Sequence, residues 1–85
     1  MIYAIDFIYR NKLQRQPLRE LRQELTGAEL LDYSVSRPHI LTAAKLDSKD
    51  IIYIDTYNLY YMILDQIEQP DGVHIQLQAI AKRPD

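Results

Sequence analysis

The segment Pro70-Asp71-Gly72 constrains the fold more than any other part of this 85-residue chain. It separates two runs of apolar and β-prone residues, 59–69 and 73–81. Pro presets φ, Asp tolerates turn conformations and Gly supplies a positive φ, so the segment predicts a β-hairpin with a type I turn and a bulge. The second run alternates between apolar residues at odd positions and polar residues at 74, 76 and 78, which is typical of a half-buried strand.

Residues 57–69 fit two structures. Thr56 is able to cap a helix that carries Leu59, Ile63 and Ile67 on one stripe, which would complete the ferredoxin-like order β-α-β-β-α-β. The turn favours a strand instead, because it brings the two alternating runs into register. The expected facing pairs are Glu68–Val73, Leu64–Leu77, Met62–Ala79 and Tyr60–Ala81 on an apolar face, with Asp65–Gln76 and Ile67–His74 on the other.

The N-terminal part predicts one strand and one helix. Residues 1–9 are apolar on both faces of an extended chain, which indicates a central strand. Leu18, Leu21 and Leu25 recur at helical spacing after Pro17, and Gly27 is a natural stop, so we expect a helix over about 17–26. Residues 28–32 are expected to add a further turn after a break.

The rest of the chain predicts strands joined by turns. Residues 39–46 and 51–55 have strand character, and the polar segment 47–50 between them sets Leu46 opposite Ile51 and Ala44 opposite Tyr53. The expected fold is therefore one α+β domain, residues 1–85, with a largely antiparallel sheet in the order β-α-β-β-β-β. The C-terminal strands form a meander, and the one helix packs on a face of the sheet. The alternative fold is the ferredoxin-like order β-α-β-β-α-β.

Composition narrows the class of protein. The 26% of charged residues with few Gly and Pro indicates a folded domain, and the absence of cysteine suits a reducing compartment. The N-terminus does not resemble a signal peptide, and the longest apolar run, 59–64, is far shorter than the roughly 20 residues of a membrane helix. We expect a cytoplasmic protein that does not span a membrane.

The predicted sheet has more apolar surface than one helix can cover. The uncovered face would expose a group of Tyr and Ile residues, and an apolar patch of that extent usually marks an interface. The expected interface residues are Ile52, Ile54, Tyr61, Ile63 and Ile80. The first hypothesis is a non-enzymatic protein-interaction module, an adaptor, regulator or inhibitor that forms a homodimer. The competing interpretation is that a second helical segment or the first strand covers this face.

A basic segment at 10–22 carries the second hypothesis, a nucleic-acid-binding module. Its cationic residues are Arg10, Lys12, Arg15, Arg19 and Arg22, against Glu20 alone. If the expected helix began before Arg15, the side chains of Arg15, Arg19 and Arg22 would line one of its faces and bind phosphates. The net charge of −2 and the ordinary charge of surface helices favour a solvated face instead.

Catalytic signatures are weak. Asp6 and Asp55, in or beside apolar strands, are a pair of hard oxygen ligands that would suit Mg²⁺ and a metal-dependent nuclease, but Asp at a strand end is more often a turn residue. His39 and His74 are isolated in the sequence, and His74 lies on a polar strand face where solvation is expected. No catalytic residue, metal site or cofactor is therefore predicted.

Overall fold

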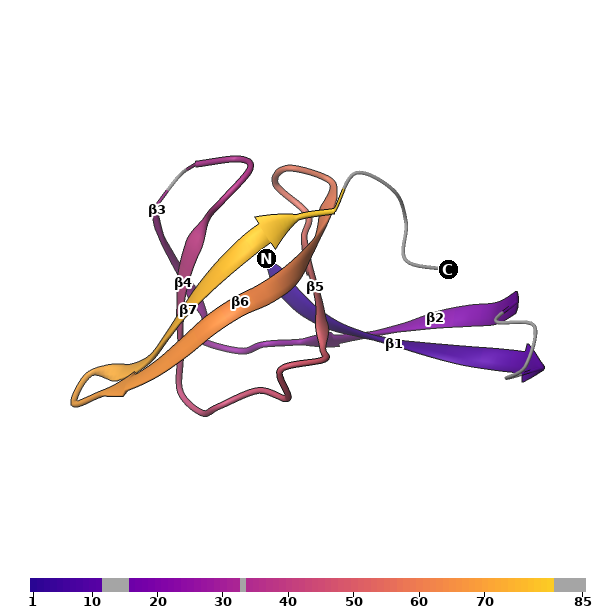
Figure 1. Ribbon diagram of the computed structural model, residues 1–85, viewed down its shortest axis with the longest axis horizontal. Helices are drawn as coiled ribbons and strands as arrows, with labels where there is room; N and C mark the ends of the chain where they lie inside the picture. The colour runs from indigo at the N-terminus through magenta and orange to yellow at the C-terminus, as the bar shows by residue number, and fades with distance from the viewer. Residues whose placement is uncertain (12–15, 33, 81–85) are drawn as a thin grey trace.

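The computed structural model contains one highly twisted antiparallel sheet (Figure 1). It describes the backbone of residues 1–11, 16–32 and 34–80, and the side chains of residues 1–6, 19–32 and 34–80. The strands are β1 (Ile2–Asn11), β2 (Gln16–Glu24), β3 (Glu29–Asp32), β4 (His39–Thr42), β5 (Ile51–Ile54), β6 (Leu59–Gln69) and β7 (Gly72–Ala79). Their spatial order is β2-β1-β5-β6-β7-β4-β3.

One face of the sheet forms the core, and it needs no helix to cover it. The core residues are Ile2, Ile40, Ile52, Ile54, Tyr61, Ile63, Val73, Ile75 and Leu77. The chain leaves β2 at one edge of the sheet and enters β3 at the other edge, so residues 25–28 cross from one end of the strand order to the other. Leu25, Ala28 and Leu30 pack against the core on the way, and Leu25 N–H donates to the carbonyl of Ile2 at 2.9 Å.

The expected helix at 17–26 is wrong, and with it the α+β class. The structure is all-β in the residues it describes, and β2 runs antiparallel to β1 with Asp6 facing Leu21 and Tyr3 facing Glu24. Main-chain pairing with β1 overrides the helical spacing of the leucines, because local propensity is a weak preference. The further turn expected over 28–32 is also wrong, because Glu29–Asp32 form β3.

The strand interpretation of 57–69 is confirmed over Leu59–Gln69, which excludes the ferredoxin-like order, and residues 57 and 58 lie in a turn. Near the turn the facing pairs are as predicted: Glu68–Val73, Ile67–His74 and Asp65–Gln76. A bulge between Ile63 and Asp65 then shifts the register by one residue, so that Ile63 faces Leu77 and Tyr61 faces Ala79. The predicted pairs Leu64–Leu77 and Met62–Ala79 are therefore wrong, and Met62 and Leu64 are exposed. Ala81 lies outside the described residues.

The predicted meander is wrong at its first turn. Residues 47–50 do form a turn, in which Asp50 N–H donates to the carbonyl of Asp47 at 2.9 Å. This turn does not join paired strands, because β4 pairs with β7 and β3, whereas β5 pairs with β1 and β6. The consequence for function is that β4 brings His39 to the neighbourhood of His74 in β7.

Gly72, the last residue of the predicted turn, is also the first residue of β7. Its φ is +140°, and a Cβ at this position would lie 2.7 Å from the carbonyl oxygen of Thr42. The positive φ expected of this glycine is therefore confirmed. The residues that the structure describes contain no helix that is long and apolar enough to cross a membrane.

Candidate interaction surface

Four of the five predicted interface residues are in the core. Ile52, Ile54, Tyr61 and Ile63 are buried, and the Tyr61 hydroxyl donates to the carbonyl of Val35 at 2.6 Å. Burial also raises the pKa of the Tyr61 phenol. Ile80 is half-buried, and its N–H donates to the carbonyl of Tyr60 at 2.9 Å. The curvature of the sheet covers the face that a flat sheet would expose, so the four buried residues are not available to a partner.

The part of β1 and β2 that extends beyond the core is a two-stranded ribbon. β1 pairs with β5 only over Ile2–Ile5, whereas its pairing with β2 continues to Asn11. In Figure 1 this ribbon projects away from the rest of the sheet. Two strands alone are marginally stable in water. A further strand or another surface beside the ribbon would therefore stabilise it.

The outer edge of β2 is the long open edge of this sheet. Among the described residues β2 has β1 on one side and no strand on the other. The opposite edge, β3, has only four residues, two of which are acidic. β2 has nine, and Pro17, which has no N–H to donate, lies near its start. An unpaired edge of this length presents a row of main-chain donors and acceptors to another strand.

Alternation places the side chains of β2 on two sides of the sheet. Arg19, Leu21 and Gln23 share one side, and all three are exposed, Leu21 to 41%. Glu20 and Arg22 share the other side, where Arg22 Nε donates to Glu20 Oε2 at 2.6 Å.

A tyrosine cluster covers the sheet face opposite the core, and Arg22 belongs to it. We define the cluster as Tyr3, Tyr53 and Tyr60 with Glu20 and Arg22. The Arg22 guanidinium lies 4.1 Å from the centroid of the Tyr53 ring, and Tyr60 OH donates to Glu20 at 2.6 Å. The hydrogen bond to Glu20 raises the pKa of Arg22. This cluster fixes the base of the ribbon to the body of the protein.

The predicted phosphate-binding face does not form as expected. Arg10 lies in β1, and Lys12 and Arg15 lie outside the described residues. Arg19 and Arg22 lie in a strand on opposite sides of the sheet, so the helical face proposed to align them does not exist. Arg19 and Arg22 are both exposed, and Arg22 is held by Glu20 and Tyr53.

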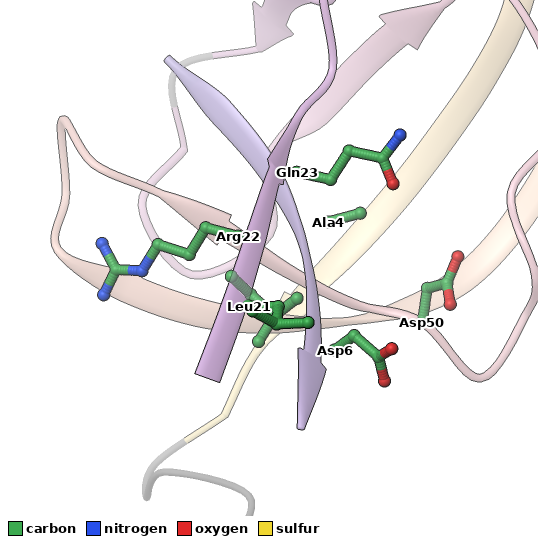
Figure 2. A pocket seen from close by; sticks show the side chains of 7 residues that line it. Ala4, Asp6, Leu21, Arg22, Gln23 and Asp50 are labelled. Carbon is green, nitrogen blue, oxygen red and sulfur yellow. The ribbon is translucent and has the colours of Figure 1, made fainter. Parts of the chain in front are cut away.

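A depression of about 410 Å³ lies beside β2 on the side that carries Leu21. Asp6, Leu21, Gln23 and Asp50 line it, and Figure 2 shows Arg22 directed away from the two carboxylates. Burial, and to a lesser degree the nearby charges of Asp47 and Asp6, raises the pKa of Asp50, against a hydrogen bond to Asp47 that lowers it.

The predicted pair of Asp6 and Asp55 is not brought together. Asp55 follows β5 and binds the amino group of Met1 at 2.5 Å, which lowers the pKa of its carboxyl group. Asp6 lies beyond the other end of the β1–β5 ladder.

Sequence reasoning missed a second group of polar residues. His39 Nε2 lies 3.1 Å from His74 Nδ1, and His74 Nε2 lies 2.9 Å from Asp71 Oδ1. The hydrogen bond with His74 lowers the pKa of Asp71. The two histidines are 35 positions apart in the sequence, and the pairing of β4 with β7 brings them together.

Comparisons of this chain with protein-family models, with curated proteins and with solved structures gave no match.

Proposed function

We propose that this protein is a non-enzymatic interaction module that self-associates through the edge of β2. The observation that supports the proposal is the nine-residue open edge of β2 on a projecting ribbon. Strand addition at such an edge supplies main-chain hydrogen bonds to a partner. The occupant we propose is a second copy of β2, related by a two-fold axis, since two-fold dimers are the commonest oligomers.

Symmetry limits the possible registers. Residues that face each other in neighbouring strands point their side chains to the same side of the sheet. A two-fold axis perpendicular to the sheet keeps every side chain on its own side. Successive residues point to opposite sides, so no residue can face the sequence neighbour of its own copy in the second strand. The axis therefore passes beside a residue that faces its own copy.

Among the residues of β2 whose side chains the structure describes, 19–24, charge then favours one register. An axis at Arg19, Glu20 or Arg22 would place like charges opposite each other, which destabilises a strand pair. An axis at Gln23 would leave little strand to pair, because β2 ends at Glu24. An axis at Leu21 places two exposed leucines together.

The register centred on Leu21 also sets opposite charges facing each other. Glu20, which already accepts hydrogen bonds from Arg22 and Tyr60 of its own chain, faces Arg22 of the second copy on one side of the sheet, twice by symmetry. Arg19 faces Gln23 of the second copy on the other side, at the border of the depression that Asp6 and Asp50 line. The edge of β2 is therefore complementary to the same edge of a second copy in this register. This complementarity favours association of the two copies and also fixes their relative orientation.

The cytoplasm is the compartment that we propose for this dimer, supported by the absence of cysteine from the sequence. Nucleic-acid binding through the basic segment has less support, because Arg22 is already engaged by Glu20 and Tyr53.

Sedimentation equilibrium of two matched variants tests the proposal. Leu21→Lys places two ammonium groups at the proposed axis, and Leu31→Lys makes the same change on the short β3 edge, where Leu31 is equally exposed at 42%. We expect the wild type and Leu31→Lys to sediment at twice the 10.0 kDa chain mass and Leu21→Lys at the chain mass. Circular dichroism checks that both variants fold. A monomeric wild type, or a Leu21→Lys variant that dimerises like the wild type, would refute the proposal.

A further inference from the structure

We propose that His39 and His74 form a binding site for one transition-metal ion of the Zn²⁺ or Cu²⁺ class. The site lies on the sheet face opposite the core, where β4 and β7 run side by side. The two ligand atoms are His39 Nε2 and His74 Nδ1. Imidazole nitrogens are preferred ligands of zinc and copper, and this chain contains no cysteine and no other histidine.

The separation of the two nitrogens fits one shared ion. Zinc–nitrogen bonds are about 2.0–2.1 Å long, so two nitrogens on one ion lie roughly 2.9–3.4 Å apart for angles between about 90° and 109° at the metal. His39 Nε2 and His74 Nδ1 are 3.1 Å apart, and their rings are tilted by 57° with centroids 5.1 Å apart. An ion at this bond length would lie to one side of the line between the two nitrogens, so each imidazole would turn to point its lone pair at the ion.

Asp71 prepares His74 for this role. Its carboxylate accepts a hydrogen bond from His74 Nε2 at 2.9 Å, which leaves the lone pair on Nδ1, the atom that faces His39. A carboxylate behind a metal-binding imidazole fixes the ring and raises its basicity. His39 remains neutral on binding when it carries its proton on Nδ1, so that Nε2 is free to bind the ion.

The surroundings admit an ion with its water. Two depressions of about 400 and 270 Å³ lie beside the pair, lined by His39, Ile67 and His74 together with Gln69 and Asp71 in one and Asp65 and Gln76 in the other. The carboxylates of Asp65 and Asp71 favour a cation here. No group of three or more His, Asp or Glu side chains in the described residues is arranged to hold a metal. Water molecules therefore complete the coordination, and the ion exchanges readily.

Isothermal titration of the untagged full chain with Zn²⁺, and separately with Cu²⁺, tests the site. We expect one ion per chain, no saturable binding by His39→Gln or His74→Gln, and roughly tenfold weaker binding by Asp71→Asn, which keeps both imidazoles. Glu29→Gln, an exposed carboxylate in β3, is the matched control and should bind like the wild type.

Nitrogen-15 NMR of the wild type gives a readout that needs no variant. The resonances of His39 Nε2 and His74 Nδ1 should move on addition of zinc. Those of His39 Nδ1 and His74 Nε2 should keep the shifts of protonated nitrogens. An absence of saturable binding by the wild type would overturn the proposal. So would unchanged binding by a folded His74→Gln variant, which would place the ion on carboxylates instead. These outcomes are independent of dimerisation through β2.

Discussion

Tyr60 in β6 donates a 2.6 Å hydrogen bond to Glu20 in β2, although β1 and β5 lie between these strands in the sheet. The Glu20 side chain is only 8% exposed, and it also accepts a hydrogen bond from Arg22. One carboxylate therefore connects the base of the ribbon with the centre of the sheet. β2 is held by this cluster as well as by its ladder with β1.

A double-mutant cycle of Tyr60→Phe and Glu20→Gln measures this connection. Hydrogen bonds to charged groups contribute about 1.5–3 kcal/mol, so we expect a coupling energy of about 1–2 kcal/mol in the free energy of unfolding by urea. Tyr3→Phe is the control, because the Tyr3 hydroxyl donates only to the Met1 sulfur at 3.4 Å, a weak acceptor. Additive effects of the two changes would show that the hydrogen bond does not stabilise the ribbon.

Two glycines with positive φ should differ in their tolerance of alanine. At Gly72 a Cβ would lie 2.7 Å from Thr42 O, and its φ of +140° is strained for any L side chain. At Gly27 the φ is +79° and a Cβ meets nothing within 4 Å. We expect Gly27→Ala to cost about 1 kcal/mol and Gly72→Ala about 3 kcal/mol or more in urea unfolding. Equal costs would contradict the close approach of β7 to β4.

Asp50→Asn should stabilise the protein at neutral pH. The pKa of Asp50 is raised by burial, so the folded state binds its proton more tightly than the unfolded state does. The ionised carboxylate therefore disfavours folding above the folded-state pKa, and this cost disappears as pH falls below the ordinary Asp value. We expect Asp50→Asn to be more stable than the wild type at pH 7 and no more stable near pH 3 in urea unfolding. A gain that is the same at both pH values would show that ionisation is not the cause.

The C-terminal hairpin was predictable because its turn residues and its alternation agree. The register was correct from Gln69 back to Asp65 and failed at the bulge after Ile63. A bulge adds one residue to one strand and turns each following side chain to the other face. The sequence carries no mark of it, since both Leu64 and Ile63 are apolar. This single residue moved Tyr61 and Ile63 from the predicted surface into the core.

β2 could not be recognised from its own sequence. A strand shows alternation when one face is buried, but Arg19 to Glu24 lie at an edge where both sides carry charge. The leucine spacing was then the strongest local pattern, and it indicated a helix. Only the pairing with β1, which is a long-range relationship, determines the structure of this segment. The His39–His74 pair escaped notice for a similar reason, because it depends on the position of β4.

Engineered cysteines test whether β2 pairs with β2 of a second copy around Leu21. Facing residues of an antiparallel pair have Cα atoms about 4.5–5.5 Å apart, which a disulfide can span, and the natural chain has no cysteine. Under mild oxidation we expect Leu21→Cys to form a covalent dimer. Arg19→Cys and Gln23→Cys should not do so alone, since each lies roughly 13 Å from its own copy along the strand. A mixture of these two variants should form the heterodimer, because the residues face each other. Crosslinking of Arg19→Cys alone as fast as Leu21→Cys, or no crosslinking of Leu21→Cys, would contradict the account.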